Sequence, residues 1–187
     1  RQEHNILFCI DEVQSGFYRM GTLYGYMTYG EYKPDIICLG KGLTSSLPLS
    51  AVLSNNKIID LDPSANLSSS HAGNTICCAA GLANLEFLTD TAFQSELQER
   101  IIVFEHRSKA LLNYKNVIDV NVKGMVAGII LDNTPRTDAI VKYCVLNGVL
   151  PVWTKRESIK LGPPLTITVD AINETFDVIE EGIWNYG

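Results

Sequence analysis

A lysine between two glycines directly follows a short apolar run, and its surroundings suit a nucleophile. The apolar run is Ile36–Leu39, and Gly40-Lys41-Gly42 comes next. Four successive apolar residues predict a buried strand that ends at the first glycine. An ammonium group at the mouth of such a strand is poorly solvated, so its neutral, nucleophilic form is favoured. The alternative interpretation is a surface lysine in a turn after an edge strand, and the local pattern leaves both open.

A second group of polar residues follows the first predicted strand. The run Asn5–Ile10 is almost continuously apolar and predicts a strand buried on both faces of a parallel sheet. The sequence Asp11-Glu12-Val13-Gln14-Ser15-Gly16 follows it. Because ligands of open α/β sheets bind beyond the carboxyl ends of the strands, acids at this end are candidate site residues. The alternative is a helix N-cap, a role that Asp and Ser favour.

A third polar group lies ahead of a predicted helix. The turn-rich segment Asp62–Ser70 leads into His71-Ala72-Gly73-Asn74, which opens a helix that runs to about Leu88. Hydroxyl and backbone N–H groups ahead of a helix form an anion-binding arrangement. Ordinary capping by Ser and Asn explains the same pattern, and His71 by itself is typical of a packed or capping histidine.

These groups need a scaffold, and the sequence predicts one in two parts. The first part adds a loop with a short helix over Gly16–Tyr32 and a short strand over Ser50–Leu53. The second part begins with a long amphipathic helix from Thr91. Its further predicted elements are the strands Val117–Val122, Met125–Leu131, Val149–Thr154 and Ser158–Leu161 and the helices Thr137–Leu146 and Asp170–Trp184. We place the boundary near Asp90, which divides the chain into residues 1–90 and a separate α+β unit, residues 91–187.

Composition excludes several classes of partner. The 187 residues carry a net charge of −6 and no block of basic residues, which argues against nucleic acid. No apolar run approaches about 18 residues, so the sequence predicts no membrane span. The cysteines show no paired spacing that would indicate zinc or a disulfide framework. They are expected to be reduced core residues of a cytoplasmic protein, and they are Cys9, Cys38, Cys77, Cys78 and Cys144.

Several short motifs together resemble the class III pyridoxal-phosphate aminotransferases, the group that contains ornithine, 4-aminobutyrate and diaminobutyrate aminotransferases. In chain order they are Asp11–Phe17, Pro34-Asp35-Ile36, Gly40-Lys41-Gly42, Leu47-Pro48-Leu49 and Gly73-Asn74. The resemblance implies that residues 1–90 are part of a fold-type I large domain, an α/β fold with a mostly parallel sheet. It implies that residues 91–187 are an α+β small domain. The implied activity moves an amino group from an amine or amino acid to a 2-oxo acid.

The resemblance assigns roles in a pyridoxal 5′-phosphate site. Lys41 resembles the family's Schiff-base lysine, which also moves the substrate proton as a general acid and base. Asp11 resembles the carboxylate that keeps the cofactor's ring nitrogen protonated. Val13 resembles the residue packed on one ring face, and Gln14 the residue that bonds the ring's 3′ oxygen. Ser70 falls at a threonine whose hydroxyl reaches the cofactor phosphate of the neighbouring subunit, which implies a homodimer with shared active sites.

Two features depart from the family pattern. The family typically has an arginine ahead of Pro-Pro-Leu that grips the substrate carboxylate, whereas this chain has Lys160 ahead of Gly162–Leu165. Lysine keeps the charge but lacks the two-pronged guanidinium, so Lys160 as a substrate-binding residue implies an atypical substrate. The family's phosphate loop and cofactor-stacking aromatic residue precede Asp11 and have no counterpart here, which implies a missing segment or a complementary N-terminal chain.

Alternative functions remain open at this stage. Racemases, epimerases and aminomutases of the same fold keep the cofactor chemistry but change its outcome. A non-catalytic subunit that completes a partner chain is the alternative from another class. The intact Asp11, Gln14 and Lys41 argue against a degenerate remnant, because unused buried acids and lysines are costly to keep.

Overall fold

The computed structural model describes residues 2–59 and 69–186, and the chain divides into two compact units. Unit 1 is Arg1–Gln94 and unit 2 is Ser95–Gly187. The assignment of residues 1–90 and 91–187 to the family's large and small domains stays a prediction. Most of the predicted turn-rich segment Asp62–Ser70 lies outside the described residues. No helix within the described ranges is long and apolar enough to cross a membrane.

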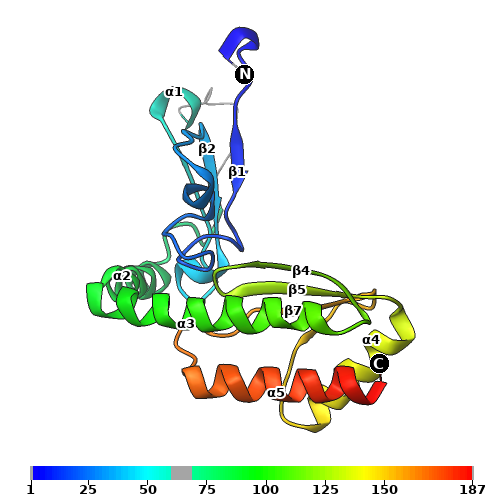
Figure 1. The fold of residues 1–187 in the computed structure, drawn as a ribbon. Coiled ribbons are helices and arrows are strands. Elements are labelled where there is room, and N and C mark those ends of the chain that lie inside the picture. The colour runs from blue at the N-terminus through cyan, green and yellow to red at the C-terminus, as the bar shows by residue number, and fades with distance from the viewer. Residues whose placement is uncertain (1, 60–68, 187) are drawn as a thin grey trace. The chain divides into compact units, whose positions relative to one another are not determined.

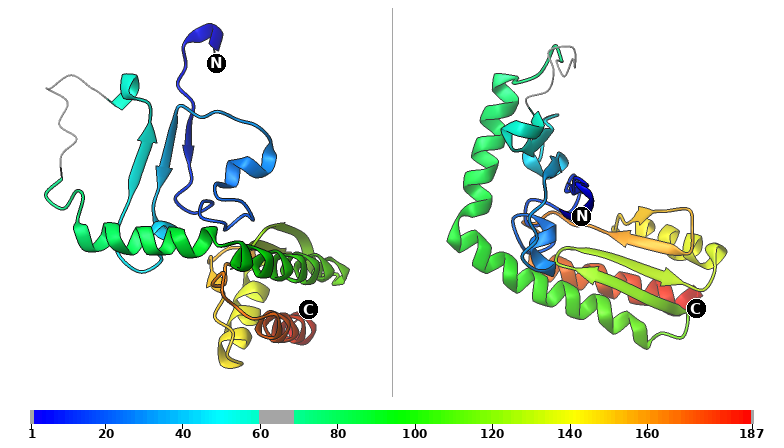
Figure 2. Two further views of the ribbon diagram at one scale, coloured as in Figure 1. Left: turned by 90° about the vertical axis from the view of Figure 1, so that its left-hand side faces the viewer. Right: turned by 90° about the horizontal axis from the view of Figure 1, so that it is seen from above.

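Unit 1 contains a three-stranded sheet in the order β1-β2-β3, drawn side by side in the left view of Figure 2. The strands are β1 (Cys9–Asp11), β2 (Ile36–Leu39) and β3 (Ala51–Ser54). β1 and β2 are parallel, with Asp11 opposite Cys38, whereas β3 is antiparallel to β2. The parallel pairing places the carboxyl ends of β1 and β2 at the same edge, which is the edge where both predicted polar groups begin.

The first strand differs from its prediction. We expected Asn5–Ile10 to be buried on both faces, but β1 is Cys9–Asp11 and its residues are exposed or half-buried. Ile6 and Leu7, ahead of it, are 59% and 55% exposed. The reason is topological, since β2 is the one strand that pairs with β1 among the described residues. An apolar run indicates that a strand tends to be buried. Within the described residues β1 is an edge strand, so no neighbouring strand covers its second edge.

Helices and turns complete unit 1. The predicted short helix in the loop after β1 is confirmed as a 3₁₀ turn, Gly25–Tyr29. Further elements are a 3₁₀ turn at Lys41–Leu43, a 3₁₀ turn at Gln2–His4, α1 (Asn56–Ile59) and α2 (Thr75–Thr89). The Asn74 side chain accepts hydrogen bonds from the backbone N–H groups of Ile76 and Cys77 at 3.1 and 3.2 Å, so this residue caps α2.

Unit 2 contains a four-stranded antiparallel sheet in the order β4-β5-β7-β6. Figure 1 shows α4 and α5 on one face of this sheet. The elements are α3 (Thr91–Ala110, which begins in the last residues of unit 1), a 3₁₀ turn at Leu111–Asn113, β4 (Val117–Lys123), β5 (Val126–Leu131), α4 (Thr134–Leu146), β6 (Val152–Trp153), β7 (Ser158–Leu161) and α5 (Val169–Tyr186). The predicted strands and helices of this region are therefore all present, with β6 shorter than expected.

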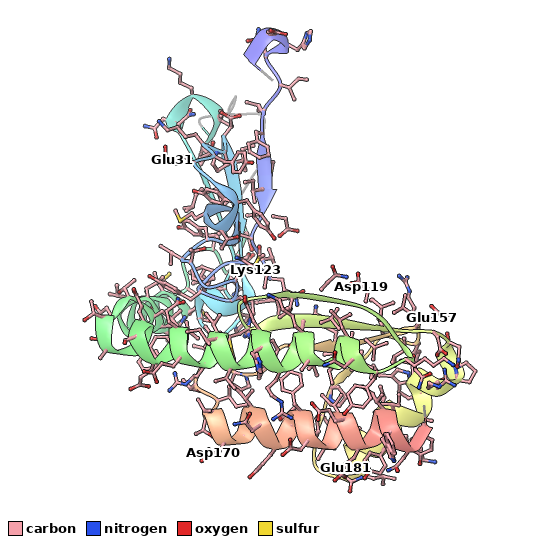
Figure 3. The ribbon with its side chains drawn as sticks, viewed as in Figure 1. Glu31, Asp119, Lys123, Glu157, Asp170 and Glu181 are labelled. Carbon is pink, nitrogen blue, oxygen red and sulfur yellow. The ribbon has the colours of Figure 1, made fainter. Side chains whose placement is uncertain are left out.

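The core of unit 2 follows from two periodicities. Alternate residues of β5 are buried, and so are the apolar residues on one face of α5, which are Ile172, Phe176, Ile179 and Ile183. Phe176 of α5 meets Phe104 of α3 edge to face, with ring centroids 5.6 Å apart. Burying an aromatic side chain of this size contributes roughly 1.5–3 kcal/mol. Figure 3 shows Asp119 of β4 extending from the sheet on the side away from α5.

Candidate active site

Lys41 lies in a strained turn at the carboxyl end of β2. Its φ of 40° places a non-glycine residue in the left-handed region, which costs on the order of 1–3 kcal/mol and concentrates at functional sites. Gly40, just before it, is buried and extended, and its carbonyl accepts a hydrogen bond from the Leu43 N–H at 3.0 Å. The Lys41 side chain is exposed to solvent in the part of the chain that the structure describes. The expectation of a poorly solvated ammonium group is therefore wrong there.

The structure brings Lys41 and Gln14 together from different strand ends. The Lys41 Nζ donates a hydrogen bond to Gln14 Oε1 at 3.2 Å. Gln14 belongs to the turn after β1, and Lys41 to the turn after β2. Two predicted site residues that are 27 positions apart in the chain therefore share a direct contact. Because of this contact, the Lys41 amine lies next to the turn that follows β1.

Asp11 ends β1 and shapes the turn that follows it. Its Oδ1 accepts a hydrogen bond from the Val13 N–H at 2.9 Å, which closes a local turn. The alternative of a helix N-cap is wrong, because turns and not a helix follow over residues 13–20. The Asp11 side chain is exposed, and among the described residues no hydrogen bond to its Oδ2 is found. Val13 packs beside Gly40, where an added Cβ would lie 3.4 Å from Val13 Cγ1. Asp11 and Val13 thus lie at the same sheet edge as Lys41.

Glu12 is a residue whose structural role the sequence did not predict. It is 1% exposed, yet each carboxylate oxygen has partners. Oε2 accepts from Ser15 Oγ at 2.7 Å and from the Gly25 N–H at 2.8 Å, and Oε1 accepts from the Tyr26 N–H at 2.8 Å. A buried carboxylate with three donors fixes the loop that carries Val13 and Gln14. The position of Asp11 and Glu12 after the strand predicted a site at this strand end. Nothing in the neighbouring sequence indicated which of the two acids would be buried.

The cysteines only partly match their predicted place in the core. All five are free thiols, with Cys77 and Cys144 buried but Cys9 and Cys78 exposed. The Cys9 and Cys38 sulfurs, on neighbouring strands, lie 3.8 Å apart. Their hydrogen bond is the main cause that raises the pKa of the Cys38 thiol.

Two further predicted site residues, Ser70 and Lys160, lie outside the turns that follow β1 and β2. Ser70 is exposed in the turn that precedes α2, and its role stays a prediction. Lys160 lies on β7 in unit 2, where it lines a cavity of about 290 Å³ whose other walls are mostly apolar. Its position in a different unit leaves its substrate role a prediction as well.

The cluster suits the cofactor that the sequence resemblance implies. An exposed carboxylate suits a cationic ring nitrogen, and an exposed primary amine suits an aldehyde. Lys41, Asp11, Val13 and Gln14 all lie at the carboxyl edge of the parallel pair β1-β2, where α/β sheets bind their ligands. The donor set on this chain therefore fits pyridoxal phosphate, with its phosphate left to other groups.

Comparisons with known proteins place the whole chain in one enzyme family. The family model described as aminotransferase class-III matches residues 1–183. An isoleucine 2-epimerase of Lentilactobacillus buchneri is 30% identical over 198 residues, which cover 96% of this chain and 42% of that protein. An ornithine aminotransferase of Oceanobacillus iheyensis is 30% identical over 184 residues, 98% of this chain and 45% of that protein. A solved ornithine aminotransferase of Plasmodium yoelii matches with a TM-score of 0.87 and 28% identity, covering 100% of this chain and 51% of its own. The chain spans less than half the length of these two curated relatives.

Proposed function

The chain belongs to the class III aminotransferases, and we propose that it carries the lysine, the acid and the amide of a pyridoxal-phosphate transaminase site. Its mixed α/β fold is that of the pyridoxal-phosphate-dependent transaminases. The observation that carries the proposal is the Lys41–Gln14 contact of 3.2 Å, formed beside Asp11 where two parallel strands end. The complete enzyme would move an amino group from an amine or amino acid to a 2-oxo acid.

Lys41 has two tasks in this proposal. When bound, pyridoxal phosphate supplies an electron sink that makes the bonds to the substrate's α-carbon labile. Lys41 Nζ would hold the cofactor covalently in the resting enzyme. As a free amine it would take the proton from the substrate α-carbon and deliver it to the cofactor's C4′ carbon, which is general acid–base work. The Gln14 amide oxygen accepts from Nζ at 3.2 Å and keeps the amine at the strand end.

The neighbours of Lys41 orient the site. Asp11 would hold a proton on the ring nitrogen by its negative charge, with the Val13 N–H at 2.9 Å fixing the carboxylate. Val13, packed beside Gly40, would cover one ring face. Ser70 would donate its hydroxyl to the phosphate bound by a second copy, so we propose a homodimer with shared sites. Residues held by this chain then serve two cofactors, one in each subunit.

Lys160 is proposed to bind the substrate carboxylate. Its ammonium is a point charge on a flexible stem, so it gives attraction without the paired geometry of a guanidinium. In the structure Lys160 lines a cavity of unit 2 whose walls are mostly apolar. A lysine at this position supports a donor whose carboxylate is held less rigidly than in family members with arginine.

A second function uses the same residues with a different outcome. Similarity to an isoleucine 2-epimerase, at the same 30% identity as to the ornithine aminotransferase, makes epimerisation the second candidate, in which Lys41 would move a proton at the α-carbon without transfer of nitrogen. The two activities separate in one experiment. A single amino-acid enantiomer is incubated with and without a 2-oxo acid. Loss of enantiomeric purity without the acceptor supports epimerisation, whereas consumption that requires the acceptor supports transamination.

The first test is the place of cofactor attachment. The complete protein is mixed with pyridoxal phosphate, its visible absorbance is recorded, and the lysine–cofactor bond is reduced with borohydride before peptide mapping. The expected result is a label confined to Lys41. Label scattered over exposed lysines such as Lys57 would contradict the proposal. Repeating the measurement on residues 1–187 alone tests the alternative of a subunit that needs a complementary N-terminal chain, because a label there would show that it does not.

A further inference from the structure

Asn84 is a polar residue of α2 whose immediate neighbours along the chain are small or apolar. It lies on α2, where Ala79–Ala83 precede it and Leu85 follows. Its Nδ2 donates hydrogen bonds to two backbone carbonyls, that of Gly42 at 2.8 Å and that of Leu43 at 3.2 Å. An amide nitrogen carries two hydrogens, so it can serve both carbonyls at once. Both carbonyls belong to the turn that carries Lys41.

The helix approaches this turn closely enough for the contact because of Gly81. A Cβ at Gly81 would lie 3.6 Å from the Leu43 carbonyl oxygen and 3.3 Å from Leu49 Cδ2. Gly81 and Asn84 are three residues apart, so they share one face of the helix. The small residue brings the backbone near, and the amide one turn later makes the hydrogen bonds.

The turn needs an external partner. The 3₁₀ turn Lys41–Leu43 has three residues, and the last carbonyls of such a short turn have no partner within it. Phe17, 3% exposed, packs on the other side, where a Cβ at Gly42 would lie 3.1 Å from Phe17 Cβ. The peptide groups that follow Lys41 are therefore held between a ring and an amide. The left-handed backbone of Lys41 persists only when such surroundings determine it.

We propose that Asn84 is a positioning residue that sets the place and direction of the Lys41 amine through the Gly42 and Leu43 carbonyls. The inference rests on the proposed function of Lys41. Without the amide, the Gly42 and Leu43 carbonyls lose this restraint, and the Lys41 side chain that precedes them can move relative to Gln14. A misplacement of about 1 Å at a reacting group costs on the order of 100-fold in rate.

The test compares three substitutions in the complete enzyme. Asn84→Asp keeps the shape but removes both donors, Asn84→Ala removes the side chain, and Asn84→Gln keeps the amide on a longer stem. Glu86→Ala, at an exposed position of the same helix, is the matched control. The readouts are kcat, KM for the amino donor, melting temperature, and the pH midpoint of the absorbance change of the Lys41-bound cofactor.

We expect Asn84→Asp and Asn84→Ala to lower kcat roughly 10-fold with KM within about 2-fold, because the amide acts on proton transfer and not on substrate binding. The pH midpoint should shift in both, and Asn84→Gln should restore part of kcat. A merely structural role would lower the melting temperature and leave kcat and the midpoint of the folded enzyme at wild-type values, which overturns the inference. If Asn84→Ala does not fold, Asn84→Asp and Asn84→Gln decide by the same two readouts.

The wild-type enzyme distinguishes this inference from its premise. Borohydride label on Lys41 in the wild type, with unchanged kinetics in all three variants, overturns the role of Asn84 and leaves the proposed function intact. Absence of Lys41 label in the wild type overturns the proposed function and the Asn84 inference together.

Discussion

Unit 1 and unit 2 differ in what holds them together. In unit 2 two packed helices and alternate strand residues enclose apolar side chains such as Ile129, Ile159 and Phe176, each fully buried. In unit 1 the strands are three and four residues long, and Ile6 and Val52 stay 59% and 58% exposed. Polar residues fix the two turns at its sheet edge, with Glu12 holding one turn and Asn84 the other.

This difference separates stability from chemistry. A hydrophobic core is non-directional and tolerates many arrangements of similar volume, so it suits a unit that must simply be stable. Hydrogen bonds fix distance and direction, so they suit the turns that must hold an amine and a carboxylate. Substitutions in the two units should accordingly change different observables.

The largest effect is expected from Lys41→Ala in unit 1. Loss of the amine removes both the attachment point and the proton carrier, so activity of the complete enzyme should fall by about 1000-fold or more. Melting temperature should hardly change, because the side chain is exposed. Lys57→Ala, also exposed in unit 1, serves as the control in the same assay. Substantial activity in Lys41→Ala would contradict the assignment of the chemistry to unit 1.

In unit 2, Phe176→Ala should lower the stability of the protein and leave its cofactor chemistry unchanged. The ring is 0% exposed and meets Phe104, so its removal should cost about 3–5 kcal/mol of unfolding free energy in a denaturant titration. The folded enzyme should keep the spectrum of its cofactor. Trp184→Ala on the same helix, where the ring is 80% exposed, should cost far less. Equal losses for the two rings would show that burial does not decide stability in this unit.

Asp11→Asn sharpens the electrostatic part of the site. An amide keeps the shape and can still accept from the Val13 N–H, but it lacks the charge that would hold the ring proton. Removal of the α-proton should slow by about 100-fold in single-turnover measurements, with cofactor still bound. Asp170→Asn, an exposed acid of unit 2, should leave the rate unchanged. A normal single-turnover rate for Asp11→Asn would remove Asp11 from the mechanism.

Lys160→Arg tests whether unit 2 contributes to substrate binding. A guanidinium can form two parallel hydrogen bonds to a carboxylate, so KM for a carboxylate-bearing donor should fall several-fold with little change in kcat. An amine donor without a carboxylate is the matched control substrate. If both donors respond alike, Lys160 acts through the fold of β7 and not through a carboxylate.

The smallest effect concerns the buried thiol of unit 2. Burial raises the pKa of the Cys144 thiol to about 11 from an ordinary 9.0. As pH rises from about 9 to about 11, the unfolded chain releases this proton while the folded chain keeps it, so stability falls. The loss is on the order of 1–2 kcal/mol. Urea titrations across this range should show a shallower decline in Cys144→Ala, and an equal decline would exclude the thiol as its source.

The sequence determined the features that depend on neighbours in the chain. The apolar run Ile36–Leu39 became β2, and the inner face of the helix Asp170–Trp184 became the buried stripe of α5. Asn74 was expected to open α2 and does so. Periodicity and capping are local, so the residues that express them are enough to predict them. The residues around Lys41 could also be selected as candidates, because strand ends concentrate site residues.

The tertiary structure decided what those candidates touch. The Lys41–Gln14 contact joins residues 27 positions apart, and the Asn84–Gly42 hydrogen bond joins residues 42 apart. The burial of Glu12, against the exposure of its neighbour Asp11, depends on a loop that folds back from Gly25. The sequence also predicted two-sided burial of the strand at Asn5–Ile10, which the described structure does not have. Local sequence patterns predict which side chains tend to be buried or to form hydrogen bonds. Which distant residues bury them or bond to them is determined only by the tertiary structure.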